Sequence, residues 1–338
     1  MRRVLVLALV GVLGGCGDTD PPFHPNDLSG IRDDMAMPDD LQMPDLQMPD
    51  LYRASWVTQS VPVPTSLYAI AGAGGEIFVV GDQGVILHST DDGAHWTRQN
   101  SATTAALFGV WTDGATAIAV GYHGTLLRSI DHGATWQATL FGAETLLGVG
   151  GGSVIGDGGS SGSMWAVGEK GTVLQSIDGG MTWVASPSLS STSLHGVWSS
   201  PVESFIVGDN GLYRTRDDGA NWTEIAFSPG SGNEVWATGS GQILVANASA
   251  VRRSRDGALT WGQLTTSGTN SVVGFAAFAN GEMWVASLTG AIDHYVNDFE
   301  SPVPDDKATV ARPIAAIWGS DPGNMFVVGD NGFIAHRQ

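Results

Sequence analysis

The sequence predicts an all-β fold, a single seven-bladed β-propeller built of four-stranded antiparallel blades. Three observations predict it: an apolar segment recurs about every 40 residues, short strand-like runs follow each recurrence, and a Ser-x-Asp-x-Gly-x-x-Trp block ends most of the units. The composition agrees, because 47 Gly and 12 Trp among 338 residues, with only 14% charged residues, favour many short strands joined by tight turns.

Seven units can be counted from their opening segments. These are LYAIAG at 67, LFGVWT at 107, LLGVGG at 146, LHGVWS at 194, EVWATG at 234, GFAAFA at 274 and IAAIWG at 314. The spacings are 40, 39, 48, 40, 40 and 40 residues, and the third unit is long because of a Gly/Ser-rich insert at 150–163. Four short strands in about 40 residues are typical of a propeller blade, whereas a stacked solenoid would not need a closed ring.

The two ends of the repeat region predict how the ring closes. The last unit stops at FIAHRQ, after its third strand, without the block and its Trp. The segment RASWVTQS at 53–60 carries Trp56 and precedes the first unit. We expect this segment to supply the missing fourth strand, so that residues 53–338 form one ring without exposed sheet edges.

The first residues predict export and a lipid anchor. Residues 1–15 combine two arginines with a short apolar run, as in a secretory signal that is too short to span a bilayer. The sequence Leu-Gly-Gly-Cys that follows resembles the cleavage box of bacterial lipoproteins, which implies that Cys16 is acylated. An ordinary signal peptide with an incidental cysteine is the alternative. An Asp directly after the cysteine resembles an inner-membrane retention signal, but this sequence has Gly17 there. The outer membrane is therefore the expected location, with the propeller facing the periplasm or the exterior.

Residues 16–52 are expected to be a disordered linker. Residues 17–52 hold nine Asp and a short Met-Pro-Asp-Leu repeat at 37–51. Proline at this density interrupts helices and strands, and the Asp charges repel one another. We interpret the segment as an acidic stalk, and a structured arm that packs on the domain is the alternative.

The repeated block is interpreted as a structural turn. An Asp side chain accepts backbone N–H bonds within its own turn, Ser assists, Gly takes a positive φ, and Trp packs under the turn or against the next blade. A cation site is the alternative, but calcium requires about six to eight oxygen ligands and each block offers one or two acids. The predicted block residues are Ser89, Asp91, Gly93, Trp96; Ser129, Asp131, Gly133, Trp136; Ser176, Asp178, Gly180, Trp183; Thr215, Asp217, Gly219, Trp222; and Ser254, Asp256 and Trp261, whose block has Ala258 in place of Gly.

These blocks match the Asp-box, or bacterial neuraminidase repeat, and the unit consensus resembles the propeller family of the photosystem II assembly and stability factors. The resemblance covers about 53–338 and implies a seven-bladed propeller that acts as a non-enzymatic assembly or binding factor. It implies neither a metal nor a cofactor. Arg128, Arg214 and Arg253 precede blocks and are interpreted as strand-face charges.

A carbohydrate-binding protein or glycosidase of the sialidase class is the alternative function. Sialidases share the Asp-box but need an arginine triad, a Tyr/Glu nucleophile pair and an early Phe/Tyr-Arg-Ile-Pro segment. This sequence has only ARPI at 311–314, late in the chain. It also lacks His-Glu-x-x-His and cysteine zinc spacings, and its eight His are scattered. We therefore expect no catalysis.

The resemblance places the ligand face opposite the Asp-boxes, at the turns between second and third strands and at the links between blades. The candidate turns are Asp82-Gln83, Tyr122-His123, Glu169-Lys170, Asp209-Asn210 and Asp330-Asn331, and turn chemistry alone also explains their residues. Their acidity favours a cationic or polar partner, a protein segment or less readily a glycan. The net charge of −19 argues against nucleic acid. We expect a monomer, with the irregular link at 296–313 as a further contact element.

Overall fold

The computed structural model divides the chain into two units, Met1–Tyr52 and Arg53–Gln338. It describes residues 55–152, 163–227, 230–238, 241–264, 266, 271–297, 299, 301–303 and 308–337. The predicted signal peptide, Cys16 and the acidic linker lie outside the described residues. In the part of the chain that is described, no helix is long and apolar enough to cross a membrane.

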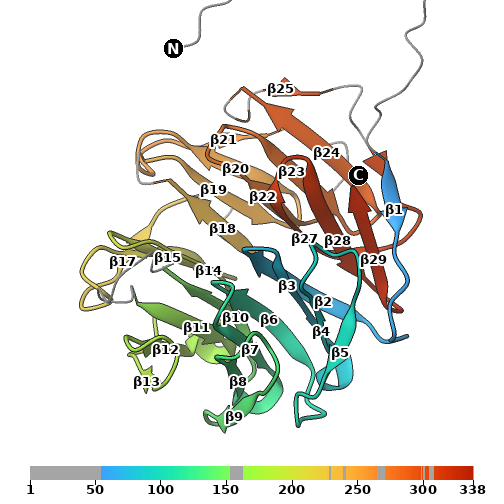
Figure 1. Ribbon diagram of the computed structural model, residues 1–338. Helices are drawn as coiled ribbons and strands as arrows, with labels where there is room; N and C mark the ends of the chain where they lie inside the picture. The colour runs from blue at the N-terminus through green and yellow to red at the C-terminus, as the bar shows by residue number, and fades with distance from the viewer. Residues whose placement is uncertain are drawn as a thin grey trace, which may run out of the picture. The chain divides into compact units, whose positions relative to one another are not determined.

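The strands form seven antiparallel sheets arranged as a ring, which confirms the seven-bladed propeller (Figure 1). The innermost strands are β2 (Leu67–Ala73), β6 (Leu107–Thr112), β10 (Leu146–Gly151), β14 (Leu194–Ser199), β18 (Glu234–Ala237), β22 (Val272–Ala277) and β27 (Ile314–Asp321). The second strands are β3 (Glu76–Gly81), β7 (Ala117–Gly121), β11 (Met164–Gly168), β15 (Ser204–Gly208), β19 (Ile243–Asn247), β23 (Met283–Ser287) and β28 (Asn324–Gly329).

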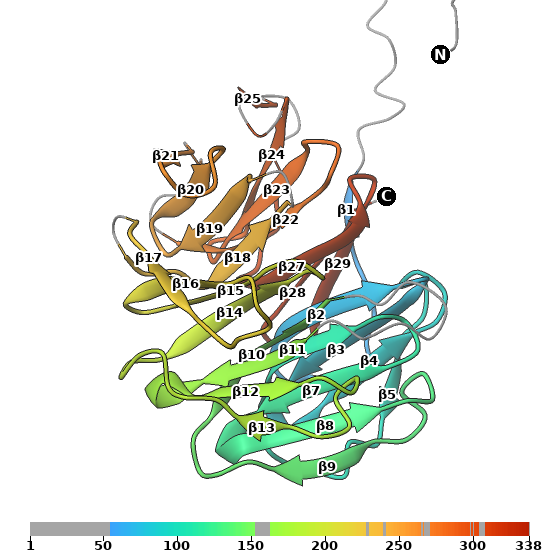
Figure 2. The ribbon, with the colours of Figure 1, turned by 90° about the vertical axis from the view of Figure 1, so that its left-hand side faces the viewer.

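The outer half of each blade holds the third and fourth strands (Figure 2). The third strands are β4 (Ile86–Ser89), β8 (Thr125–Ser129), β12 (Val173–Ser176), β16 (Gly211–Thr215), β20 (Ala250–Ser254), β24 (Ala291–Val296) and β29 (Phe333–Arg337). The fourth strands are β5 (Thr97–Gln99), β9 (Gln137–Leu140), β13 (Val184–Ala185), β17 (Thr223–Ile225), β21 (Gly262–Gln263), β25 (Ser301–Pro302) and β1 (Trp56–Thr58).

Burial explains why the strands differ in sequence. The second strands are buried along their length, apart from the first residues of β3 and β28, because a neighbouring blade covers each face, and β7 with sequence AIAVG is an example. Their apolar runs therefore show no alternation, as expected for strands that are buried on both faces. The fourth strands lie at the rim, and all four residues of β9 are exposed.

Two elements depart from the simple repeat. The blade of residues 272–309 has a fifth strand, because β26 (Ala308–Thr309) pairs with β24 beyond the short β25. This pair of short strands replaces a regular fourth strand in the irregular link at 296–313. The insert at 150–163 is shorter than expected, since Gly150 and Gly151 belong to β10.

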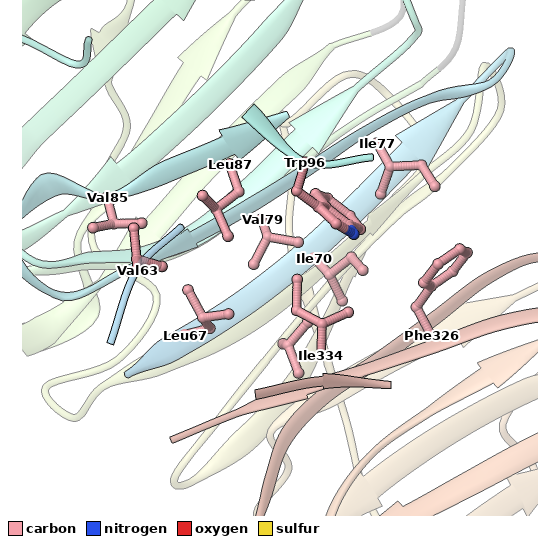
Figure 3. Packing of buried hydrophobic residues seen from close by; sticks show 11 residues of the cluster. Val63, Leu67, Ile70, Ile77, Val79, Val85, Leu87, Trp96, Phe326 and Ile334 are labelled. Atoms are coloured by element: carbon pink, nitrogen blue, oxygen red, sulfur yellow. The ribbon is translucent and has the colours of Figure 1, made fainter. Parts of the chain in front are cut away.

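The hydrophobic core consists of seven clusters, one at each interface between consecutive blades. Between the last and first blades, Phe326 and Ile334 face residues such as Leu67, Ile77 and Trp96 (Figure 3). Equivalent clusters join every other pair of neighbours around the ring. The blades are thus held face to face by apolar burial, which stabilises by roughly 25 cal/mol per Å² of apolar surface.

The N-terminal strand closes the ring as predicted. Trp56, Val57 and Thr58 of β1 pair with Arg337, His336 and Ala335 of β29, and the two strands lie side by side in Figure 1. This pairing completes the seventh blade with a strand from the opposite end of the repeat region.

Gln59, just after β1, connects the seventh blade to the first. Its Nε2 donates to Gly93 O at 2.8 Å, and its Oε1 accepts from Trp96 Nε1 at 2.6 Å. The closing segment therefore holds both the sheet edge and the Asp-box of the neighbouring blade.

Candidate functional site

Two sets of turns lie at opposite ends of the strands. In the first blade, Ser89 at the start of the Asp-box pairs with Ile77, at the beginning of β3. The turn η2 (Asp82–Gly84) joins the other ends of β3 and β4, beside the pair Val80 and Ile86. The Asp-boxes and the turns between second and third strands therefore occupy different faces of the ring.

Each Asp-box is a turn closed by its own side chains. In the second blade, Ser129 Oγ donates to Asp131 Oδ1 at 2.8 Å and accepts from Gly133 N at 2.9 Å. Asp131 also accepts from Thr135 N at 2.9 Å and from Thr135 Oγ1 at 2.6 Å. The same network recurs in the other four boxes. The carboxylates are thus engaged in the turn.

The Asp-boxes also join neighbouring blades. The box Gly lies against the second strand of the preceding blade, where a Cβ on Gly219 would stand 2.2 Å from Trp165. Trp222 meets the same Trp165 edge to face, with ring centroids 5.0 Å apart. The box Trp residues therefore pack against the preceding blade. Of the two expected placements, under the turn or against the next blade, the second was wrong, whereas Trp183 Nε1 does donate to Gly180 O of its own turn at 3.1 Å.

Arginines on the third strands reinforce the contact with the following box. Arg128 Nε donates to Gly179 O at 3.0 Å, and Arg214 Nη1 donates to Gly257 O at 3.4 Å. Arg128 and Arg214, which were predicted as strand-face charges, therefore form hydrogen bonds between neighbouring blades. Among the described residues, no group of three or more His, Cys, Asp or Glu side chains is placed to hold a metal ion.

The box carboxylates make stability depend on pH. Bonds from Thr135 lower the pKa of Asp131 to about 2, and those from His95 and Thr260 do the same for Asp91 and Asp256. For Asp178, burial raises the pKa, but the bonds from Thr182 prevail and the pKa is about 2. The pKa of an Asp in the unfolded chain is near 3.9, so these carboxylates stabilise the folded protein fully at pH values above about 3.9. This stabilisation is lost as the pH falls from there towards 2.

We therefore expect the urea midpoint of unfolding to fall between about pH 4 and pH 2. Asp131→Asn should lower the midpoint at pH 7 and reduce its slope in this acid range. The measurement is urea unfolding followed by tryptophan fluorescence at several pH values. A carboxyl of Asp131 that titrates at its ordinary value in the folded protein, observed by NMR, contradicts this account.

On the other face, three of the candidate turns share one backbone geometry. In η2, η3 (Tyr122–Gly124) and η4 (Glu169–Gly171) the middle residue has a positive φ, 55° at Gln83, 53° at His123 and 53° at Lys170. The following Gly also has a positive φ in each turn. The first N–H of each turn bonds to a carbonyl of the chain that enters the same blade, as Tyr122 N does to Ala106 O at 2.9 Å.

The other two candidate turns differ from each other. Asn331 has a φ of 56° and resembles the first three turns. The turn Asp209-Asn210 has no positive φ, because β15 and β16 approach directly through the pair Gly208 and Gly211. One residue fewer between these strands leaves a two-residue hairpin, so this turn differs in geometry from the other four.

These turns surround one end of a central channel. The cavity, of about 340 Å³, is lined by the innermost strands of all seven blades. At its mouth the ring centroids of Tyr68 and Phe108 lie 5.4 Å apart. Burial raises the pKa of Tyr68, and the nearby carboxylates of Asp82 and Asp330 raise it further. His195 Nε2 bonds to Asp209 Oδ1 at 2.8 Å.

Four acidic residues stand at this mouth, and one lysine is already paired. Asp82, Glu169, Asp209 and Asp330 belong to its turns, whereas Lys170 Nζ donates to Glu144 Oε1 at 2.8 Å. Thr145 N donates to Glu169 Oε2 at 3.0 Å, and this bond lowers the pKa of Glu169. The mouth therefore carries net negative charge at neutral pH.

Sequence reasoning missed one residue of the channel, Glu234. Its Oε2 accepts a 2.9 Å hydrogen bond from Phe275 N in the next blade, and burial raises its pKa to about 7. The channel residues at the same register in the other six blades are Ala69, Gly109, Gly148, Gly196, Gly274 and Ala316. The equal spacing of the opening segments hid this residue, because Glu234 begins EVWATG whereas the equivalent Ala69 and Gly196 are the third residues of LYAIAG and LHGVWS.

A family model described as photosynthesis system II assembly factor YCF48 matches residues 159–334. The chain belongs to this family. No curated protein matches the chain. The family match confirms the predicted resemblance to the photosystem II assembly-factor propellers.

Solved structures of YCF48 share the fold. YCF48 bound to a D1 peptide is 18% identical, with a TM-score of 0.67, covering 88% of this chain and 99% of that chain. YCF48 from Cyanidioschyzon merolae is 15% identical, with a TM-score of 0.64, covering 84% of this chain and 99% of that chain. Virginiamycin B lyase from Staphylococcus aureus is 11% identical, with a TM-score of 0.67, covering 83% of this chain and 99% of that chain. At these identities the likeness concerns the fold alone.

Proposed function

We propose that this member of the YCF48 family is a non-catalytic binding or assembly propeller that is held at the outer membrane by a lipidated Cys16. The turn-ringed mouth of the central channel binds a polypeptide segment of a membrane protein. The observation that carries this proposal is the mouth itself, where Tyr68, Phe108 and His195 line one cavity, Asp82 and Asp330 act on Tyr68, and Asp209 bonds to His195.

The family supports a binding role. Its model is described as an assembly factor, and a related propeller is found bound to a D1 peptide. A peptide that lies across the mouth can use carbonyl and amide groups of several turns, while the carboxylates steer a positively charged segment. The Asp-box face offers less for a ligand, because its carboxylates are engaged by their own turns.

A glycosidase is the less favoured function. Glycosidases of the usual type need two carboxyl groups about 5–9.5 Å apart. Among the described residues that line the channel, Glu234 is the one carboxyl group. The resemblance to a lyase propeller, at 11% identity, concerns the fold. We therefore propose that the chain recognises its target without transforming it.

The test compares equal charge changes on the two faces. The full chain, solubilised in detergent, is used to capture proteins from the envelope of its own source, and captured proteins are identified by mass spectrometry. We expect one membrane protein to be enriched, and Asp82→Asn with Asp330→Asn to lower its apparent affinity about 3- to 10-fold, more at low salt.

The matched control is Asp92→Asn with Asp218→Asn in two Asp-boxes. Asn tolerates the positive φ of 52° found at both positions, and this change removes the same number of charges from the other face. An unchanged affinity in the control supports the proposal. Equal losses in both double variants, or capture of no protein together with saturable glycan binding or glycosidase turnover, contradict it.

A further inference from the structure

At the register where the other six blades have Gly or Ala, the channel contains one ionisable side chain, Glu234. The small residues at this register are required by neighbouring backbones: a Cβ on Gly148 would stand 2.1 Å from His195 O, and one on Gly196 would stand 2.7 Å from Asn233 O. Glu234 escapes this limit because its side chain extends over Gly274, whose absent Cβ would lie 2.4 Å from Glu234 Oε2. A carboxyl group is thereby placed inside the ring.

One carboxyl oxygen is held and the other is free. Oε2 accepts the N–H of Phe275, which directly follows a bulge between Val272 and Gly274. Within the described part of the chain, Oε1 has no hydrogen-bond partner, and no cationic side chain pairs with the group. The side chain of Glu234 is half-buried, so part of the cost of ionising its carboxyl group remains, and a positive charge beside it offsets that cost.

The lining selects among possible cations. Calcium and magnesium require about six or more oxygen ligands, and the channel offers a single carboxyl group. Its other lining residues are mostly Gly, Ala, Val and Ile, with Tyr68, His195 and Asn233 as further polar groups. The aliphatic part of this lining suits the methylene stem of a lysine, whose ammonium group carries three donors. A volume of about 340 Å³ is at the lower end for ligand sites, which fits one side chain.

We propose that the channel is a lysine-side-chain pocket, in which Glu234 Oε1 receives the ammonium group of one lysine from the bound polypeptide. This proposal rests on the proposed function and defines its specificity. The lysine enters past the acidic turns and over the contacting rings of Tyr68 and Phe108, and its stem lies along the innermost strands. The ammonium group supplies the positive charge that Glu234 lacks in the free protein.

The probe is Nα-acetyl-lysine methylamide, which keeps a free ε-ammonium group. The matched neutral probe is Nα-acetyl-norleucine methylamide. We expect the lysine probe to bind the full chain saturably at pH 8.5 in NMR titrations. Its affinity should fall at least about 10-fold in Glu234→Gln, which keeps an acceptor for Phe275 N–H and removes the charge. The norleucine probe should not distinguish the two proteins.

The matched control variant is Glu203→Gln. Glu203 is a buried carboxyl that pairs with Arg216 at 3.2 Å, and it does not line the channel. Lysine-probe affinity should be unchanged in this variant. Equal affinity of wild type and Glu234→Gln, or equal binding of the two probes by wild type, overturns the proposal.

The pH dependence gives a second measurement on the wild-type chain. With its pKa raised to about 7 by burial, Glu234 should bind the lysine probe about 30-fold more weakly at pH 5.5 than at pH 8.5. The other titratable groups that line the channel are Tyr68 and His195, and the latter is bonded to Asp209. His195→Gln separates its protonation from that of Glu234 and should leave most of the pH effect intact.

The two proposals fail in different ways. If Glu234→Gln folds poorly, the titration of Glu234 in the wild-type chain decides, because the lysine probe should lower the pKa of this group by at least about one unit. If the lysine probe leaves the pKa of Glu234 unchanged, the lysine pocket is overturned. A membrane protein captured equally well by Glu234→Gln leaves the binding mouth in place and removes only its lysine specificity.

Discussion

Gly219→Ala is expected to destabilise the propeller by about 2–4 kcal/mol, through the left-handed backbone and the overpacking of a buried ring. Gly219 has a φ of 83°, and an added Cβ would stand 2.2 Å from Trp165, which is fully buried in the preceding blade. Either the ring or the box turn must move. Urea unfolding followed by tryptophan fluorescence measures the loss.

Gly179→Ala separates the two causes. Gly179 also has a positive φ, 69°, but an added Cβ would have no atom within 4 Å. Its substitution should cost only the backbone contribution, about 1 kcal/mol. The fifth box already contains Ala at the equivalent position, because Ala258 has a φ of 79° and packs against the preceding blade. Equal losses in the two variants contradict a packing role for the box Gly.

Deletion of residues 55–60 is expected to open the ring and lower the melting temperature by about 10–20 °C. The deletion removes the β1–β29 pairing, the contact of Trp56 with Trp284 at 6.3 Å, and the bonds of Gln59 to the first Asp-box. Together these are worth about 5 kcal/mol, at about 2–4 °C per kcal/mol for a domain of this size. The exposed edge of β29 should also promote aggregation.

Val57→Thr is the control for this deletion. Val57 lies in the same strand but is 44% exposed, so the substitution should move the melting temperature by less than about 2 °C. Differential scanning calorimetry measures both proteins. A deletion variant that melts within that range of the wild type shows that β1 is dispensable, and it contradicts closure by the N-terminal strand as a source of stability.

The architecture could be predicted because each blade repeats the same short sequence patterns. The apolar openings, the Gly turns and the Asp-boxes recur at fixed intervals, and the missing block after FIAHRQ pointed to Trp56 as its replacement. The fifth strand β26 could not be predicted, because the link at 296–313 has no comparable signal. The shortened turn at Asp209-Asn210 depended on a one-residue difference in length.

The channel was harder to predict, because it is assembled from seven separated strands. Glu234 is an ordinary surface residue type in isolation, and only its register beside six Gly and Ala residues marks it as internal. Three histidines also share a structural position that their scattered places in the sequence did not reveal. His88, His294 and His336 occupy equivalent places on third strands, where each stacks on an aromatic ring of the neighbouring second strand.

We propose that ligands bind at the turn-ringed mouth and not at the Asp-box face. Amide hydrogen–deuterium exchange of the full chain, with and without an oligolysine peptide, distinguishes the two faces. We expect slower exchange at 82–84, 122–124 and 169–171, together with the innermost strand around Glu234, and no change at 89–96 or 215–222. Protection confined to the Asp-box segments would contradict it.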